Sequence, residues 1–148
     1  MVKLNYYFFK RLFVVLCHKK NTGMRVLILD SSKELAKRII DHIEESNQGI
    51  SFCTATSHDE AVNYLQLHKP DVVLLDLNFY GNTATGLLQT IKQLNSKTVV
   101  IVWYNHASDY GLKICEEQGA DYLLNKYDEF EKIPKLISII KFKLLKHI

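Results

Sequence analysis

Short continuous apolar runs alternate along the chain with longer stretches in which apolar residues recur every three or four positions. A short apolar run bounded by polar residues is typical of a strand buried on both faces, and the longer spacing is typical of an amphipathic helix. Five strands are predicted in this way, and the second alternates with polar residues as a more exposed strand does. They span residues 25–29, 50–54, 71–75, 98–102 and 121–124.

A helical stretch follows each of the predicted strands. Ser31 or Ser32 offers an N-cap for the first helix, and Ser57 begins a capping box before the second. The third helix is expected at 86–94, and Gly119 is expected to end the fourth. This alternation predicts an α/β fold, in which a doubly wound, five-stranded parallel sheet carries helices on both faces.

Three chemically reactive residues follow or end predicted strands, namely Asp30, Asp76 and Lys126. In an open parallel sheet the ligand site lies at the carboxyl ends of the strands, so the fold prediction brings the three residues together. Each also has an ordinary structural explanation: Asp30 as a helix cap, Asp76 as a loop-capping acid and Lys126 as a solvated surface lysine. It is the combination of all three at one sheet edge that indicates a functional site.

The sequence resembles a response-regulator receiver domain (CheY-like) over residues 24 to about 145. The segments that carry the resemblance are Val26–Asp30, Pro70–Asn78 and Gly119–Lys126, in this order and at these strand ends. The resemblance implies a flavodoxin-like sheet with strand order 2-1-3-4-5. The residues that follow Lys126 are most similar to those of small single-domain receivers, so a stand-alone receiver is expected.

The resemblance also implies the role of each site residue. Asp76 would accept a phosphoryl group from a histidine kinase or a phosphotransfer protein, as a carboxylate nucleophile does. The carboxylates of Asp30 and Asp76 and the backbone carbonyl of Asn78 would hold Mg²⁺, and Lys126 would contact the phosphoryl oxygens. Such a protein is a signalling component rather than an enzyme, with at most weak self-dephosphorylation. It would act on a downstream protein target, and the resemblance gives the fourth and fifth helices as the face of a homodimer, although the sequence does not show whether the protein dimerises.

Four positions depart from the pattern of the family. Ser31 stands where receivers usually carry a second acid, which is expected to weaken Mg²⁺ binding. Tyr104 is assigned to the slot of a small hydroxyl residue, Leu123 to the slot of the aromatic switch residue, and Tyr127 to that of a proline. The changes at Ser31, Tyr104 and Leu123 favour an alternative: a pseudo-receiver that binds other proteins without being phosphorylated.

The net charge of +3 conceals an acidic body between two basic ends. Residues 1–23 carry five basic side chains and no acid, and so do residues 132–148, which leaves a net charge of −7 on residues 24–131. The chain is therefore divided into an N-terminal arm at 1–23 and a receiver-like domain at 24–148. The arm is expected to be loosely attached, or not native if Met24 is the true start.

The basic ends do not by themselves indicate a nucleic-acid or membrane partner. The apolar run of the arm is interrupted by Lys10 and Arg11, so it is too short to span a bilayer. No helix-turn-helix is predicted, and the lysines of the last helix suit its solvated face. We therefore expect neither a nucleic-acid nor a membrane partner.

The cysteines are few and widely spaced. Cys17, Cys53 and Cys115 form no C-x-x-C pair and are odd in number. This pattern argues against a disulfide framework or a zinc site and favours a reducing, cytoplasmic setting. Cys53 and Cys115 are expected to act as small apolar core residues.

Overall fold

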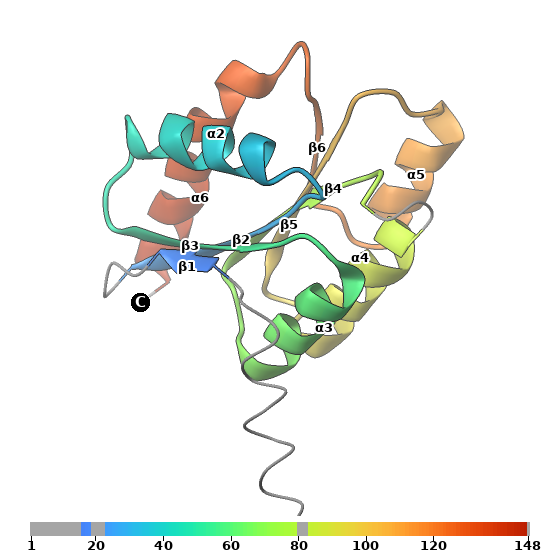
Figure 1. Cartoon of the computed structure of the whole chain (residues 1–148), viewed down its shortest axis with the longest axis horizontal. Coiled ribbons are helices and arrows are strands. Elements are labelled where there is room, and N and C mark those ends of the chain that lie inside the picture. Colours follow the sequence, from blue (N-terminus) through green and yellow to red (C-terminus); the bar gives the residue numbers. More distant parts are fainter. Residues whose placement is uncertain (1–15, 19–22, 80–82, 148) are drawn as a thin grey trace, which may run out of the picture.

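The computed structural model describes residues 16–18, 23–79 and 83–147. A central sheet runs through this part of the chain, with helices packed on both of its sides (Figure 1). In chain order the elements are β1 (Leu16–His18), β2 (Met24–Leu29), α2 (Lys33–Glu44), β3 (Ile50–Ala55), α3 (His58–Leu67), β4 (Val72–Asp76), α4 (Thr83–Leu94), β5 (Val99–Tyr104), α5 (Asp109–Glu117), β6 (Tyr122–Asn125), the 3₁₀ helix η1 (Phe130–Lys132) and α6 (Ile133–Lys146).

The strands of the described residues lie in the order β1-β3-β2-β4-β5-β6. The five strands from β2 to β6 pair in parallel and, numbered among themselves, have the order 2-1-3-4-5. This confirms the predicted flavodoxin-like sheet. Strand–helix–strand crossovers are almost always right-handed, so the helices fall on both faces because β3 lies on one side of β2 and the later strands lie on the other.

One strand was not predicted. β1 pairs antiparallel with the edge strand β3, with Leu16 opposite Thr54 and His18 opposite Phe52. Residues 16–18 belong to the segment that the sequence assigned to an arm outside the domain, yet here they extend the sheet by one strand. Residues 1–15 and 19–22, the rest of that arm before Gly23, lie outside the described residues.

Two apolar layers enclose the sheet, because successive side chains of a buried strand point to opposite faces. Val26 and Ile28 of β2 belong to the layer under α2 and α6, whereas Leu27 and Leu29 belong to the layer under α3, α4 and α5. Both layers are fully buried at this strand. A strand that is buried on both faces therefore appears in the sequence as a continuous run of apolar residues.

The helix ends largely agree with the sequence signals. The hydroxyl oxygens of Ser32, Ser57 and Ser108 accept backbone N–H groups of the first turns of α2, α3 and α5. Gly119 follows α5 with a φ of +102°, the left-handed conformation that glycine tolerates best. One boundary was placed wrongly: α4 begins at Thr83, three residues before the predicted start.

The cysteines differ from expectation at one position. Cys115 is a free, buried thiol, and burial raises its pKa. Cys53 is also buried, but it is disulfide-bonded, so the prediction that the cysteines stay unpaired is wrong there. Within the described residues, every helix is too short or too polar to cross a membrane.

Candidate functional site

The carboxyl ends of β2, β4 and β6 bring three side chains together. Asp30 follows β2, Asp76 ends β4 and Lys126 follows β6. The Nζ atom of Lys126 lies 3.3 Å from Oδ2 of Asp30 and 3.0 Å from Oδ1 of Asp76. The prediction that these residues meet at one sheet edge is confirmed, since parallel strands end at the same edge.

The two carboxylates are almost completely buried. Asp30 is 2% exposed and Asp76 is 5% exposed, and the side chain of Lys126 is 11% exposed. Burying two like charges side by side is costly unless a cation compensates them, and the Lys126 ammonium does so here. Burial still dominates at Asp30 and raises its pKa, against the lowering effects of a backbone hydrogen bond from Ser32 and of the Lys126 charge.

Backbone amides fix the orientation of both carboxylates. The Ser32 N–H donates to Oδ1 of Asp30 at 2.8 Å, so the other oxygen of Asp30 faces Lys126. The Asn78 N–H donates to Oδ1 of Asp76 at 3.1 Å. Each acid therefore shapes the loop that follows its strand and also points into the site. The cap of α2 is Ser32 and not Asp30, whose carboxylate accepts the N–H of that capping residue and also lies in the site.

A hydrogen-bonded turn holds Lys126 in place. The Asn125 N–H donates to the Glu129 carboxylate at 2.8 Å, and Oδ1 of Asn125 accepts the N–H groups of Tyr127 at 2.9 Å and Asp128 at 3.3 Å. The hydrogen bond from Asn125 lowers the pKa of Glu129, and Lys132 lowers it further. Tyr127 stands where the family usually has proline, which has no N–H to give to this turn.

Trp103 is the residue that the sequence did not place in the site. In the pairing of β4 with β5, Asp76 lies opposite Trp103, one position before Tyr104. The Trp103 side chain is 1% exposed, and Nζ of Lys126 lies 4.7 Å from the centre of its ring, a cation–π contact. The register of β4 and β5 shows that Trp103 lies in the site, because it sets Trp103 beside Asp76 on the neighbouring strand.

The remaining predicted residues surround this centre. Tyr104 is half-buried and contributes its backbone carbonyl, which accepts the Lys126 N–H at 2.7 Å. Leu123 lies on β6 and packs against the apolar layer under α3, α4 and α5, the opposite layer from Trp103. Ser31 is exposed and directly follows Asp30. The switch-like roles assigned to Tyr104 and Leu123 stay predictions.

The oxygen atoms at this edge are suited to a hard cation. Asp30 and Asp76 already share one positive group, the Lys126 ammonium, so their carboxylates point toward a common position. The described residues contain no cluster of three or more His, Cys, Asp or Glu side chains that would form an all-protein metal cage. Mg²⁺ needs no such cage, because it typically binds one or two carboxylates and keeps several waters.

Relatives among well-characterised proteins include a sensory transduction protein and an enzyme that acts on protein glutamate and glutamine. The chain is 24% identical to the sensory transduction protein LytT of Oceanobacillus iheyensis over 105 residues, which cover 70% of the chain and 43% of the relative. It is 33% identical to a protein-glutamate methylesterase/protein-glutamine glutaminase of Bacillus subtilis over 79 residues, 53% of the chain and 22% of that enzyme. The chain thus spans less than half the length of these relatives.

Solved structures agree with the fold. A response regulator receiver domain protein (CheY-like) from Methanospirillum hungatei superimposes with a TM-score of 0.74 at 16% identity, over 86% of this chain and all of the other. A receiver domain from Colwellia psychrerythraea superimposes with a TM-score of 0.69 at 24% identity, over 79% and 99% of the two chains. The family model of the response regulator receiver domain matches residues 26–138, which include all three residues at the sheet edge. The chain therefore belongs to the response regulator receiver domain family.

Proposed function

We propose that this chain is a phosphoacceptor in a two-component phosphorelay and that Asp76 is the residue that becomes phosphorylated. One observation supports this most: the Lys126 ammonium lies between the buried carboxylates of Asp30 and Asp76 at the carboxyl edge of the sheet. Phosphoryl transfer depends mainly on alignment and charge neutralisation. In this site the buried carboxylate of Asp76 provides the alignment, and the fixed ammonium of Lys126 provides the charge neutralisation.

The proposed step is a direct transfer between two proteins. A carboxylate oxygen of Asp76 attacks the phosphorus of a phosphohistidine, the P–N bond breaks, and the imidazole nitrogen leaves with the bonding electron pair. The product is an acyl phosphate on Asp76. Lys126 then pairs with the phosphoryl oxygens as a point charge, having been held next to Asp76 before the reaction.

Receiver domains bind Mg²⁺ for phosphorylation, and in this chain we assign the ion to Asp30, Asp76 and the backbone carbonyl of Asn78. When bound, the ion would neutralise charge on the phosphoryl oxygens. Ser31 weakens this binding, because a hydroxyl replaces a second carboxylate at the residue that follows Asp30. Lys126 competes for the same carboxylates and weakens it further.

The partners that suit this role are a histidine kinase or a phosphotransfer protein as donor and a downstream protein as target. A cytoplasmic location, a stand-alone organisation and a homodimer through α5 and α6 are predictions from the family resemblance. The part of the chain that the structure describes adds one consideration. The basic residues of α6 lie on a mixed apolar and basic face, which does not by itself favour nucleic acid.

A pseudo-receiver is the second candidate, and Trp103 favours it. Its indole lies in the strand position beside Asp76 and 4.7 Å from the Lys126 ammonium, one position before Tyr104, the residue assigned to the slot of the small hydroxyl residue. In a pseudo-receiver, Lys126 would serve as the permanent counter-ion of Asp30 and Asp76, and the protein would bind its targets without phosphorylation.

Acetyl phosphate with Mg²⁺ distinguishes the two candidates. After incubation, intact-mass spectrometry is expected to show one phosphoryl adduct, which is absent from D76N and present in D109N, a matched change at an exposed aspartate. Beryllofluoride should bind the unchanged chain and not D76N. The absence of both the adduct and beryllofluoride binding in the unchanged chain would contradict phosphorylation and leave the pseudo-receiver.

A further inference from the structure

The last helix exposes an unusual amount of apolar surface. Ile139 is 42% exposed, Phe142 is 59% exposed and Leu145 is 60% exposed, all on α6. Single exposed apolar residues are ordinary, but a group of them on one helix marks an interaction surface. The opposite face of α6 is buried against the sheet through Ile133, Ile137 and Ile140. The exposed residues therefore do not contribute to the core.

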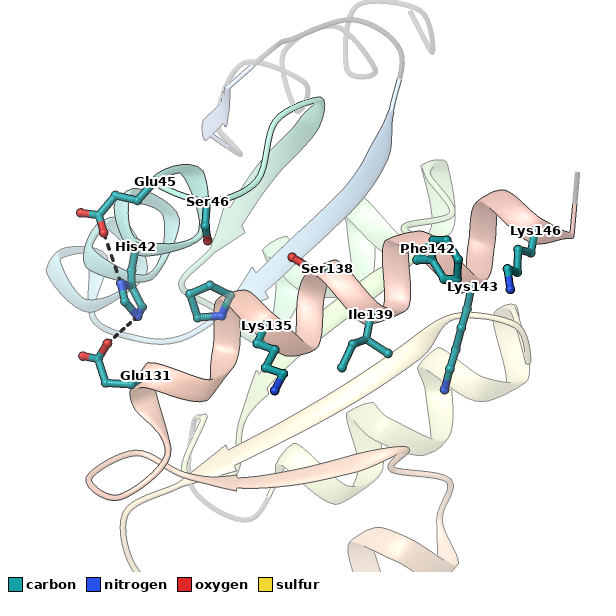
Figure 2. A pocket seen from close by; sticks show the side chains of 11 residues that line it. His42, Glu45, Ser46, Glu131, Lys135, Ser138, Ile139, Phe142, Lys143 and Lys146 are labelled. Carbon is teal, nitrogen blue, oxygen red and sulfur yellow. Dashed lines mark ion pairs between the residues drawn. The ribbon is translucent and has the colours of Figure 1, made fainter.

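Ile139 and Phe142 line a groove between α6 and the carboxyl-terminal part of α2 (Figure 2). Its volume is about 860 Å³, and it runs along α6 from Pro134 to Lys146. The α6 positions facing it follow the spacing of one helix face, from Lys135 through Ile139 and Phe142 to Lys146. A surface of this shape is suited to an elongated partner.

The two ends of the groove differ in charge. At its start, His42 lies between two acids, with its ring nitrogens 3.7 Å from Glu45 and 3.2 Å from Glu131 (Figure 2). The basic side chains of α6 line the rest, and the helix itself carries no acid. Within the described residues, three lysines lining the groove have no carboxylate within ion-pair distance: Lys135, Lys143 and Lys146.

We propose that this groove binds an acidic amphipathic helix of a partner protein. The apolar face of such a helix would cover Ile139 and Phe142, and its acidic residues would pair with Lys143 and Lys146. Lys146 already lies over the ring of Phe142 at 4.5 Å, so one side chain presents both kinds of contact at the same place. A helix laid into an apolar groove is a recurring mode of recognition between proteins.

A flat anionic surface fits the same residues less well. The groove is concave, and Glu45 and Glu131 lie at its α2 end, where they would repel an anionic membrane or a nucleic acid. A helix tolerates this arrangement, because its basic or neutral end can lie beside the two acids. This inference goes beyond the proposed function, since it uses none of the residues assigned to phosphorylation.

The groove nevertheless adjoins the site through aromatic rings. His42 stacks on Phe130 with ring centres 5.0 Å apart and nearly parallel planes, and Phe130 lies 6.3 Å from Trp103, the ring below Lys126. A helix bound against His42 would therefore lie two ring contacts from the Asp76 site. Trp103, the single tryptophan of the chain, is placed to report such binding.

The test uses the full chain and two labelled helical peptides of about 18 residues, or five turns. Both carry leucine on one face, and the opposite face carries glutamate in one peptide and lysine in the other. Fluorescence anisotropy is expected to show binding of the acidic peptide and at least roughly tenfold weaker binding of the basic one. Two variants are expected to bind the acidic peptide about tenfold more weakly than the unchanged chain: F142A, and the double variant K143E/K146E.

Matched controls lie elsewhere on the surface. Leu67 on α3 is 64% exposed and Lys97 is an exposed lysine, so L67A and K97E should bind the acidic peptide as the unchanged chain does. Circular dichroism checks that every variant is folded. Equal binding of both peptides, unaltered binding by the groove variants, or binding only to vesicles of phosphatidylglycerol would overturn the proposal. None of these outcomes bears on Asp76, which D76N tests separately.

Discussion

Lys126 and Asp30 are separated by 96 positions in the sequence, yet the ammonium of Lys126 lies 3.3 Å from Oδ2 of Asp30. The same ammonium lies 3.0 Å from Asp76. One lysine thus compensates two buried carboxylates that come from neighbouring strands. Because the charges depend on one another, changes at any of the three residues should alter stability and ion binding together.

Replacing Lys126 with methionine should destabilise the fold. The variant keeps most of the side-chain volume but leaves two buried carboxylates without their cation, at an expected cost of about 3 kcal/mol in the free energy of unfolding at neutral pH. Urea unfolding measures this cost, and added Mg²⁺ should recover part of it. K113M, at a lysine whose side chain is 71% exposed, should change little. Equal stability of K126M and K113M would contradict the pairing.

Replacing Asp30 with asparagine should stabilise the protein at neutral pH. Burial raises the pKa of Asp30 above its ordinary value of 3.8, so the folded state holds the proton more tightly than the unfolded chain. Protonation of Asp30 therefore stabilises the folded state. This stabilisation is complete below the ordinary pKa and is lost as the pH rises through the raised pKa. We expect D30N to melt a few degrees higher than the unchanged chain at pH 7.

Thermal unfolding at a second pH separates this effect from a general improvement in packing. The difference between D30N and the unchanged chain should shrink as the pH falls below the raised pKa, because Asp30 is then protonated in the folded state, and it should vanish below the ordinary pKa, where Asp30 is protonated in both states. If the difference in melting temperature between D30N and the unchanged chain stayed constant with pH, ionisation of Asp30 would not be its cause.

Glu129 should show the opposite dependence. Its pKa lies below the ordinary value of 4.5, chiefly because its carboxylate accepts the Asn125 N–H. The stabilisation is present above the ordinary value and is lost as the pH falls through the lowered pKa. E129Q is expected to lose about 1 kcal/mol in the free energy of unfolding at pH 7 and less in acid. E44Q, at an exposed glutamate, is the control and should lose nothing at either pH.

Restoring the second acid should strengthen ion binding. Ser31 is exposed and follows Asp30 directly, so S31D adds a carboxylate at the edge of the site. We expect its Mg²⁺ dissociation constant to fall by about tenfold, a gain of roughly 1.4 kcal/mol. A titration followed by the fluorescence of Trp103, which lies against Lys126, measures this constant. S96D, at another exposed serine, should leave the Mg²⁺ dissociation constant unchanged. An unchanged constant in S31D would contradict the assignment of the ligands.

Local sequence determined most of the sheet and most of the helix ends. The apolar run from Val26 to Leu29 is buried on both faces because β2 is central, and such a strand needs no polar side. The serines that cap α2, α3 and α5 act within three residues of themselves, so their function is readable from the local sequence. The strand order of the five parallel strands followed from the family resemblance and was confirmed.

Only the tertiary structure placed β1 and Trp103. β1 is three residues long and is stabilised by pairing with β3, so its own sequence carried too little periodicity to reveal it. The assignment of Trp103 depends on register, because a shift of one position exchanges the two faces of a strand. That register placed Trp103, rather than Tyr104, opposite Asp76.

The sequence by itself determined which charged residues meet at the sheet edge: an acid that follows β2, an acid that ends β4, and a lysine that follows β6. Strand ends could be located from local patterns, and parallel strands must share an edge. The tertiary structure decided how these charges compensate one another and which surface of α6 stays open. Burial, distance and register are properties of the packed sheet, and no local segment of the chain contains them.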